Sequence, residues 1–278
     1  MKLVSAMPVI TLLTDFGMQD EYAGIMKGVI LSINPAASIV DISHCLSPYD
    51  IVNAAYLIEY YYKYFPKGSI HVIVVDPGVG SNRTILAVLH NGHYFIAPDN
   101  GVLTLLCEDG EPEKIIKLLR SKWFLKPVSN TFHGRDIFSP VAAHLSNGVG
   151  MEEFGTEASR NTLVTINIVK PEISDNGELT GEIVSIDRFG NLITNIDTKK
   201  LDEFFLIAGE KNFHIIVGNK KIDKLSLAYE HAGQNNPLAI IGSRGFLEIA
   251  VNRGSAEDYF EAKKRDRIRI VKVFNYGS

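Results

Sequence analysis

The run His-Val-Ile-Val-Val at 71–75 is almost entirely apolar and ends in the turn Asp76–Gly80. A strand of this composition has no polar face, so it must be buried on both sides of a sheet. Strand-like runs at 9–14 and 38–42 precede it, and apolar residues at helical spacing fill the intervals. We therefore expect an α/β domain in which a central, mostly parallel sheet is flanked by helices.

Three segments of this half predict helices, because their apolar residues recur every three to four positions: 20–34, 47–65 and 136–147. The second helix is expected to begin with Ser47 as its N-cap and with Pro48 in its first turn. The runs 84–89 and 94–97 are β-rich and are separated by a short polar turn, which predicts a β-hairpin.

The pattern changes from about residue 175, where short β-rich segments alternate with Gly, Asn and Asp and only one helical pattern stands out, at 255–263. This is typical of a small all-β domain, either a barrel or a sandwich. We expect an α/β N-terminal domain over 1–172 and a smaller all-β C-terminal domain over 173–278. The segments expected as strands are 178–187, 191–196, 212–222, 238–243, 246–252 and 267–274.

Composition excludes several classes of protein. The 278 residues carry 28 Lys and Arg against 32 Asp and Glu, a net charge of −4, which gives no footprint for nucleic acid. No stretch approaches roughly 18 continuous apolar residues, so no membrane partner is expected, and the N-terminal run reads as a first strand. Cys45 and Cys107 form no CxxC pair. Two free thiols in a cytoplasmic protein are the simpler expectation, although one disulfide stays open.

Acidic residues follow apolar runs at four places: Asp15, Asp41, Asp76 and Asp99. In an open α/β sheet the carboxyl ends of the strands line the ligand crevice. A carboxylate there can accept hydrogen bonds from ribose hydroxyls or act as a base. The alternative is that these residues only cap helices and form turns.

Other loops offer further candidates. Glycines and Arg83 follow Asp76, but the loop has neither the GxxxxGK[ST] nor the GxGxxG pattern, so a phosphate cradle is weakly indicated. His133 can act as a general base or can simply bond the backbone at a helix entry. Phe189 and Asn191 can stack on and read a flat base, or can belong to an ordinary hairpin turn. Because no HExxH, GxSxG or closely spaced His/Cys set is present, metal-dependent and serine-hydrolase chemistry gain no support.

Eight motifs in chain order resemble the S-adenosylmethionine (SAM) hydroxide adenosyltransferases, also called SAM hydrolases, whose superfamily includes enzymes that attack SAM with halide. The resemblance covers nearly the whole chain. One departure is Asn130, which separates Ser129 from Thr131 where the family pattern has Ser directly before Thr-Phe-His-Gly. The motifs are TDFG (14–17), DISH (41–44), SPYD (47–50), VVDPGVG (74–80) with Arg83, APDNG (97–101), SNTFHGRDIF (129–138), DRFGNLITNI (187–196) and GSRGFLEIAVN (242–252).

The resemblance implies hydrolysis of SAM to adenosine and L-methionine, with Asp76, Arg83 and His133 handling the attacking water and no cofactor. In the halogenases the Asp position is not an acid, so the chain is more similar to the hydrolases. A halogenase and a non-catalytic SAM- or adenosine-binding module are the alternatives. The resemblance also implies a homotrimer that binds SAM between the N-terminal domain of one subunit and the C-terminal domain of its neighbour.

The resemblance further implies a set of substrate-binding residues. Asp15 matches a residue that bonds the ribose hydroxyls, and Tyr49 matches an aromatic residue near the ribose. The other aromatic matches are Phe132, Phe189 and Tyr229. The remaining matches lie in the C-terminal half: Asn191 for adenine, Asp187, Ser243 and Arg244 for the methionine end, Val251 at the start of a stretch that contacts adenine through its backbone, and Glu248 on the strand after Ser243 and Arg244.

Overall fold

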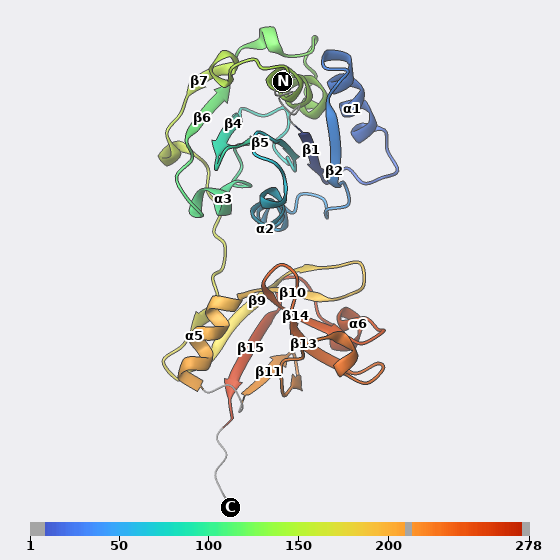
Figure 1. Cartoon of the computed structure of the whole chain (residues 1–278), viewed down its shortest axis with the longest axis vertical. Coiled ribbons are helices and arrows are strands. Elements are labelled where there is room, and N and C mark those ends of the chain that lie inside the picture. Colours follow the sequence, from blue (N-terminus) through green and yellow to red (C-terminus); the bar gives the residue numbers. More distant parts are fainter. Residues whose placement is uncertain (1–8, 209–212, 274–278) are drawn as a thin grey trace, which may run out of the picture. The chain divides into compact units, whose positions relative to one another are not determined.

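The computed structural model describes residues 9–208 and 213–273 (Figure 1). The chain divides into two compact units, Met1–Asn167 and Ile168–Ser278. The sequence predicted the domain boundary between residues 172 and 173. Each unit has its own hydrophobic core. The first unit is α/β and the second is built on antiparallel strands, which confirms the predicted fold class.

The first unit contains a seven-stranded mixed sheet. Counted across the sheet rather than along the chain, the first four strands are mutually parallel. Each of the last three pairs antiparallel with the strand before it. The predicted hairpin is present and turns at Asn91 and Gly92, both with positive φ. In spatial order the strands are β2 (Ser38–Ser43), β1 (Val9–Thr14), β3 (Ile70–Val74), β5 (His93–Pro98), β4 (Ile85–His90), β6 (Lys114–Leu118) and β7 (Gly155–Glu157).

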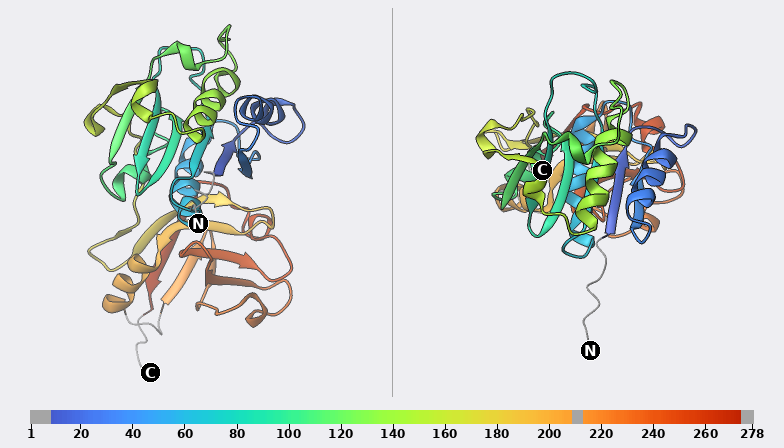
Figure 2. Two further views of the ribbon diagram at one scale, coloured as in Figure 1. Left: turned by 45° about the horizontal axis from the view of Figure 1, so that its top comes forward. Right: turned by 90° about the horizontal axis from the view of Figure 1, so that it is seen from above.

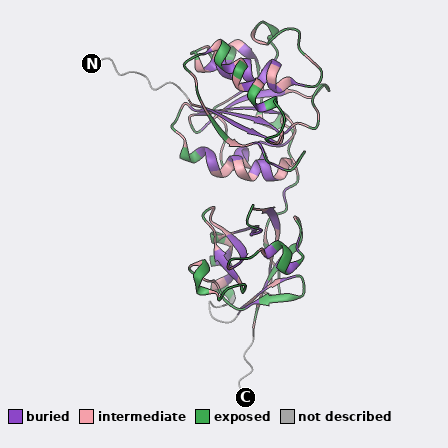
Figure 3. Ribbon diagram, turned by 90° about the vertical axis from the view of Figure 1, so that its right-hand side faces the viewer, coloured by how far each residue is buried: buried purple, intermediate pink, exposed green. Residues whose placement is uncertain are grey.

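Helices cover both faces of this sheet, as the apolar composition of its central strands requires (Figures 2 and 3). Alternate residues of β3 enter opposite cores: Val72 lies in the cluster with α1 and α4, and Ile73 lies in the cluster with α2 and α3. The helices are α1 (Tyr22–Ile33), α2 (Ile51–Tyr61), α3 (Thr104–Glu108) and α4 (Ser139–Ser146), with single turns at Tyr62–Tyr64, Ser121–Trp123, Met151–Phe154 and Arg160–Thr162.

Two predicted helix starts in this unit are wrong. Helix α2 begins at Ile51 rather than at Pro48, and its N-cap is Asp50, whose Oδ1 accepts a hydrogen bond of 3.1 Å from the Asn53 amide. The physical reason is Tyr49, whose φ of +66° is incompatible with a right-handed helix. The helix expected from residue 136 opens instead with a wide π-helical turn, Gly134–Phe138, and α4 begins at Ser139.

The second unit is an antiparallel sheet, as predicted. The segment expected as one strand over 212–222 is a hairpin of two strands, and residues 212 and 274 of the expected segments lie outside the described part of the chain. In spatial order the strands are β12 (Lys220–Ile222), β11 (Phe213–Val217), β15 (Arg267–Lys272), β9 (Leu179–Ile186), β10 (Leu192–Asp197), β14 (Phe246–Val251) and β13 (Pro237–Ile241), and β8 (Glu172–Ile173) pairs with β9.

The sequence predicted one helix in this unit, but its described residues contain two α-helices and a single 3₁₀ turn at Tyr229–His231. The predicted one is α6 (Ala256–Phe260), and the missed one is α5 (Thr198–Ala208). Asp197 caps α5, since its Oδ1 accepts a hydrogen bond of 2.7 Å from the Lys200 amide. Leu201 and Phe204 are buried against the sheet. Their i, i+3 spacing was the available signal, and the polar residues around it resembled a loop.

Two general expectations can be compared with the structure. Cys45 is exposed and Cys107 is buried, and both are free thiols. Over residues 9–208 and 213–273, no helix combines the length and the apolar character that crossing a membrane requires.

A cluster of buried histidines lies within the sheet of the first unit. His71, on β3, contacts the Thr11 hydroxyl through Nδ1 at 2.8 Å, and its Nε2 lies 3.3 Å from Nδ1 of His93. Its ring also stacks on Phe95, with 4.9 Å between centroids. Burial and, to a smaller extent, the charge of His93 lower the pKa of His71 to about 3.

We predict that acid destabilises the protein through this cluster. Because the pKa of His71 is lower in the folded chain than the unfolded value of roughly 6.5, its contribution is complete above that pH. It is lost progressively as the pH falls toward 3, at up to about 1.4 kcal/mol per pH unit. Urea unfolding of wild type and His71→Gln, repeated between pH 7.5 and 4, measures this slope.

The His71→Gln variant is expected to be less stable at neutral pH and to have a shallower pH slope. The control is His231→Gln, which changes an exposed histidine of the second unit. An unchanged slope in His71→Gln would show that the acid sensitivity arises elsewhere.

Candidate active site

Polar residues of the first unit gather where the parallel strands end. Asp15 directly follows β1, and Asp76 lies two residues beyond the end of β3. Both line a pocket of about 290 Å³. The other two candidate acids do not lie in it: Asp41 belongs to β2 and contacts Lys27 and His44, and Asp99 accepts a hydrogen bond from the Val164 amide. The expectation that acids at strand ends line a ligand crevice therefore holds in this pocket for Asp15 and Asp76, and not for Asp41 and Asp99.

Asp76, Arg83 and His133 are in direct contact. Nε of Arg83 donates to both oxygens of Asp76, at 2.6 and 2.7 Å, and its Nη2 also contacts the same carboxylate. Nη2 of Arg83 lies 2.9 Å from Nδ1 of His133. The side chains of Asp76 and Arg83 are 4% and 9% exposed, so this is a buried, hydrogen-bonded ion pair. Asp76 and His133 line the pocket, and Arg83 connects them from outside its lining.

The contact with Arg83 fixes the tautomer of His133. A guanidinium can only donate hydrogen bonds, so Nδ1 of His133 is the acceptor and the ring proton of the neutral imidazole sits on Nε2. Burial and then the positive charge of Arg83 lower the pKa of His133, while Asp76 and a hydrogen bond with the Ser129 backbone act in the opposite direction. The site therefore favours neutral His133 with Nδ1 already occupied.

Asp15 also lines this pocket and organises the loop that carries Tyr49. Its Oδ2 accepts a hydrogen bond of 2.8 Å from the backbone amide of Tyr49, which holds that residue in its left-handed conformation. Tyr49 is 68% exposed. Burial raises the pKa of Asp15, and the neighbouring charge of Asp76 adds to this effect. Asp15 is thus a partly desolvated acceptor beside an exposed aromatic ring.

Aromatic rings complete the lining. Phe132 packs edge-on against Phe16 and Tyr22, with centroids 6.0 and 5.1 Å apart. Phe16 and Val79 also line the pocket, and the sequence analysis did not select either as a site residue. Both lie inside the motifs TDFG and VVDPGVG, in the same loops as Asp15 and Asp76. Their place in these loops could have identified them as lining residues.

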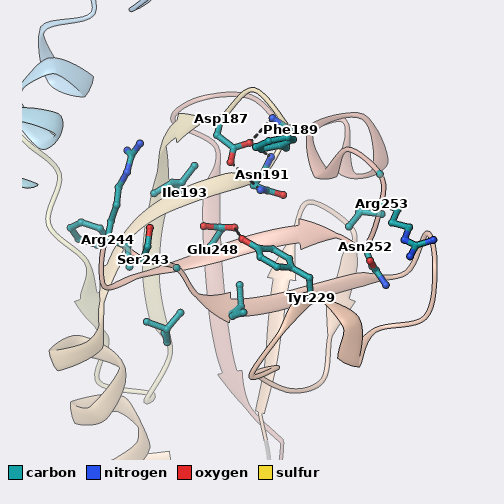
Figure 4. A pocket seen from close by; sticks show the side chains of 16 residues that line it. Asp187, Phe189, Asn191, Ile193, Tyr229, Ser243, Arg244, Glu248, Asn252 and Arg253 are labelled. Atoms are coloured by element: carbon teal, nitrogen blue, oxygen red, sulfur yellow. Dashed lines mark hydrogen bonds between the residues drawn. The ribbon is translucent and has the colours of Figure 1, made fainter. Parts of the chain in front are cut away.

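A second, larger pocket of about 760 Å³ lies in the second unit (Figure 4). It brings together every site residue that the sequence predicted in this half: Asp187, Phe189, Asn191, Tyr229, Ser243, Arg244, Glu248 and Val251. Residues that the sequence analysis did not select also line it, among them Ile193, Ile240 and Phe246. They are apolar strand residues without a distinguishing motif of their own.

The loop between β9 and β10 is organised by Asp187. Its Oδ1 accepts hydrogen bonds from the amides of Phe189 and Asn191, at 2.8 and 2.9 Å, and its Oδ2 accepts one from Nδ2 of Asn191, at 3.0 Å. One N–H of Asn191 Nδ2 is used in this way, so the orientation of the side-chain amide is set and its Oδ1 is an acceptor that a ligand donor can meet. Phe189 is 77% exposed, so its ring is not buried in the turn, as it would be if it served only to pack an ordinary hairpin.

Tyr229 and Glu248 form a hydrogen-bonded pair in this pocket. The Tyr229 hydroxyl donates to Oε1 of Glu248 at 2.5 Å. Ser243 and Arg244 lie in the turn between β13 and β14, and Glu248 follows on β14. Across residues 9–208 and 213–273, no three His, Cys, Asp or Glu side chains are grouped so that they could hold a metal ion.

The fold and the two pockets define a two-unit α/β-plus-β protein with polar, aromatic-lined sites suited to a small charged ligand with a flat ring. Two family models match the sequence. The SAM hydroxide adenosyltransferase N-terminal domain matches residues 10–155, and the C-terminal domain of that family matches residues 181–269. The chain belongs to the SAM hydroxide adenosyltransferase family.

Individual relatives agree with this membership. The (R)-S-adenosyl-L-methionine hydrolase of Thermus thermophilus is 34% identical over 266 residues, covering 93% of this chain and 98% of that protein. The hydrolase of the same name from Methanocaldococcus jannaschii is 36% identical over 276 residues, 95% of each. A fluorinase of Actinoplanes is 28% identical, covering 96% and 98%. A crystal structure of a conserved protein from Thermotoga maritima matches with a TM-score of 0.87 at 35% identity, over 95% and 100% of the two chains.

We predict that Gly80→Ala separates the two loops that build the Asp76–Arg83–His133 cluster. Gly80 has a φ of +78°, and a Cβ there would lie 2.2 Å from the Asn130 carbonyl oxygen. The substitution should cost roughly 1–3 kcal/mol of unfolding free energy. It should also raise the pKa of His133, since Arg83 moves away, and an NMR titration of the imidazole measures this.

Gly24→Ala is the matched control, because a Cβ at Gly24, in helix α1, meets nothing within 4 Å. It is expected to stabilise the chain by roughly 0.5–1 kcal/mol and to leave the His133 titration unchanged. Wild-type titration of His133 in Gly80→Ala would mean that the loop contact does not hold the cluster together.

Proposed function

We propose that the protein hydrolyses S-adenosyl-L-methionine to adenosine and L-methionine, by in-line attack of an activated water on C5′. The observation that carries this proposal is the buried Asp76–Arg83 ion pair joined to His133, with Asp76 and His133 in the wall of the first pocket. The family membership and the hydrolases at 34% and 36% identity support it.

In this reaction the attacking water needs activation, and the leaving group does not. Methionine departs from a sulfonium as a neutral thioether, so the leaving group needs no general acid. The barrier lies with the nucleophile, because the pKa of free water is about 15.7. A site lowers this activation barrier when it orients one water in line with C5′ and sulfur and accepts the proton of that water as the bond forms. No metal or organic cofactor enters this mechanism, and SAM is the substrate.

We assign the proton to Asp76. Nδ1 of His133 accepts a hydrogen bond from Arg83, and burial together with the Arg83 charge lowers the pKa of the ring. His133 is therefore a poor proton acceptor, and its one ring proton, on Nε2, is held by the hydrogen bond with the Ser129 backbone. Arg83 holds the carboxylate and the imidazole in their relative positions. The sequence left Asp76 and His133 as equal candidates for this role.

The substrate-binding roles follow the two pockets. In the first unit, Asp15 accepts from the ribose hydroxyls and the rings of Tyr49 and Phe132 pack near the sugar. In the second unit, Phe189 and Tyr229 pack on the flat base, Oδ1 of Asn191 accepts from the adenine amino group, and the backbone after Val251 contacts the same base. Asp187, Ser243 and Arg244 serve the methionine part, whose amine and carboxylate must both be paired.

The halogenase alternative is disfavoured because the first pocket keeps the acid Asp76, which occupies the position that is not an acid in the halogenases. The fluorinase relative is also less similar, at 28% identity. A non-catalytic binding module would use the same pockets without turnover, so product analysis decides between it and the hydrolase.

The test is incubation of the purified protein with SAM in chloride-free buffer and in buffers with chloride or fluoride, with products separated by chromatography. We expect adenosine and methionine in equal amounts in all three buffers, no 5′-halogenated adenosine, and no change with EDTA. Asp76→Asn should lower kcat by at least about 100-fold, because it removes the proton acceptor but keeps the size of the side chain.

Asp99→Asn is the control for that substitution, since Asp99 also follows a strand but lies outside the first pocket. It is expected to keep wild-type kcat. A 5′-halogenated product would support the halogenase, and bound SAM without any product would support the binding module. Wild-type kcat in Asp76→Asn would remove the assigned proton acceptor.

We further propose a cytoplasmic homotrimer in which SAM meets the first unit of one subunit and the second unit of its neighbour. The family resemblance supports this arrangement, as do the exposed rings of Tyr49 and Phe189, one in each unit. Light scattering on the purified protein should give the mass of three chains. A monomer that turns over SAM would contradict the shared site.

A further inference from the structure

Strands β1 and β2, which lie side by side in the first unit, pair irregularly toward their carboxyl ends (Figure 1). Leu12 pairs with Asp41, but the next residue, Leu13, pairs with Ser43, so β2 holds one extra residue at this point. Residues three positions apart on a regular strand face opposite sides of the sheet. A bulge of one residue brings such a pair to the same side, and here it brings Asp41 and His44 together.

His44 joins the ends of both strands. Its Nδ1 lies 2.8 Å from the hydroxyl of Thr14, the last residue of β1, and its Nε2 lies 3.1 Å from Oδ1 of Asp41. Because a carboxylate can only accept, the ring proton of the neutral imidazole sits on Nε2, and the Thr14 hydroxyl donates to Nδ1. Lys27 contacts the other oxygen of Asp41 at 2.5 Å. The ring of His44 is therefore oriented from both sides.

The same residue contacts both ends of the turn that carries Asp15. On the near side, the Thr14 oxygen that donates to His44 also accepts a hydrogen bond of 3.3 Å from the Phe16 amide. On the far side, the Gly17 amide donates to the His44 carbonyl oxygen at 2.6 Å. His44 thus holds the chain before and after Asp15, once through its ring and once through its backbone.

An acid, a histidine and a hydroxyl in contact also occur in nucleophilic hydrolases, but this set is closed to a ligand. Thr14 is 0% and His44 2% exposed, and neither lines the first pocket. Burial acts to raise the pKa of Asp41, but Lys27 and His44 outweigh it and hold that pKa below its usual value, so Asp41 is a charged anchor. The set therefore acts on the structure beside the pocket and not on the substrate itself.

Resting on the proposed function, we infer that His44 is a positioning residue for Asp15 and thereby sets how tightly the site binds the ribose hydroxyls. Oδ2 of Asp15 is engaged by the Tyr49 amide, so the carboxylate has a defined direction. Hydrogen bonds weaken steeply with misalignment, so that direction decides the strength of a contact with a ribose hydroxyl. It depends on the backbone at Thr14 and Gly17, which His44 holds.

The test compares adenosine, a product of the proposed reaction, with 2′,3′-dideoxyadenosine, which lacks both hydroxyls that Asp15 is proposed to bind. Isothermal titration gives Kd of both ligands for wild type and for each variant. The ratio of the two Kd values measures recognition of the hydroxyls, because a general loss of structure weakens both ligands alike. Wild type should bind adenosine about 10- to 100-fold more tightly, the range of hydrogen bonds to a charged group.

Two variants of His44 have side chains of the same size and differ in polarity. His44→Leu removes both ring contacts and should lower the ratio by at least about fivefold, since the turn around Asp15 is no longer held. His44→Asn keeps an acceptor for the Thr14 hydroxyl and should stay within about twofold of the wild-type ratio. The control is His90→Leu, because His90 is also buried but pairs with His93 at the start of β5, away from the strand ends that form the pocket. It should keep the wild-type ratio.

A double-mutant cycle shows whether His44 acts through Asp15. Asp15→Ala should bring the ratio to within about threefold of unity, and the addition of His44→Leu should then change it no further. Thr14→Val removes only the hydroxyl and should lower the ratio as His44→Leu does. It takes the place of His44→Leu in the cycle if that variant does not fold.

A wild-type ratio in His44→Leu and Thr14→Val overturns the inference and leaves the proposed function intact. Equally low ratios in His44→Asn and His44→Leu also overturn it, as does a further fall of the ratio when His44→Leu is added to Asp15→Ala. If wild type hydrolyses SAM but binds both nucleosides equally, the ribose role of Asp15 and the inference fall together. If wild type neither hydrolyses SAM nor binds adenosine, the proposed function falls as well.

Discussion

The buried ion pair between Asp76 and Arg83 is the interaction on which the first site depends. Two nearly inaccessible charges are tolerable only when each satisfies the other, and removing one partner of such a pair typically costs about 3–5 kcal/mol. Arg83 meets this requirement and reaches His133 as well, so one guanidinium sets both the position of a carboxylate and the tautomer of an imidazole. The chemistry assigned to the pocket follows from that double contact.

The sheet of the first unit and the loops after its strands bring the residues of this site together. Parallel strands β1 and β3 end at the same edge, so Asp15 and Asp76 arrive in one pocket without any sequence proximity. Gly80 lets the loop after β3 pass against the Asn130 carbonyl, which brings Arg83 to His133. The second unit works by local means instead, since a single carboxylate, Asp187, shapes its loop within four residues.

The sequence predicted the fold class and the main strands, because strand periodicity is a local signal. Its motifs also contained the polar and aromatic residues that the structure gathers in the two pockets, but not apolar lining residues such as Ile240. It did not predict that Asp41 and Asp99 lie elsewhere, since strand order decides which strand ends meet. It also misplaced the start of α2, because nothing in Ser-Pro-Tyr-Asp reveals a left-handed tyrosine held by a distant carboxylate. Helix α5 was missed because its short apolar stripe is set among charged residues. The pairing of Tyr229 with Glu248 joins residues 19 positions apart and needed the hairpin register.

The hydrogen bond from the Tyr49 amide to Asp15 has a consequence for affinity. A tyrosine with a φ of +66° is strained, at a cost of roughly 1–2 kcal/mol, and the chain meets that cost when it folds. The backbone at Tyr49 is therefore already fixed when a ligand arrives, and binding loses little further backbone conformational entropy there. A ligand donor that approaches Asp15 meets a carboxylate whose Oδ2 is already bonded to the Tyr49 amide. The folding reaction, rather than the binding reaction, therefore supplies the order at this end of the pocket.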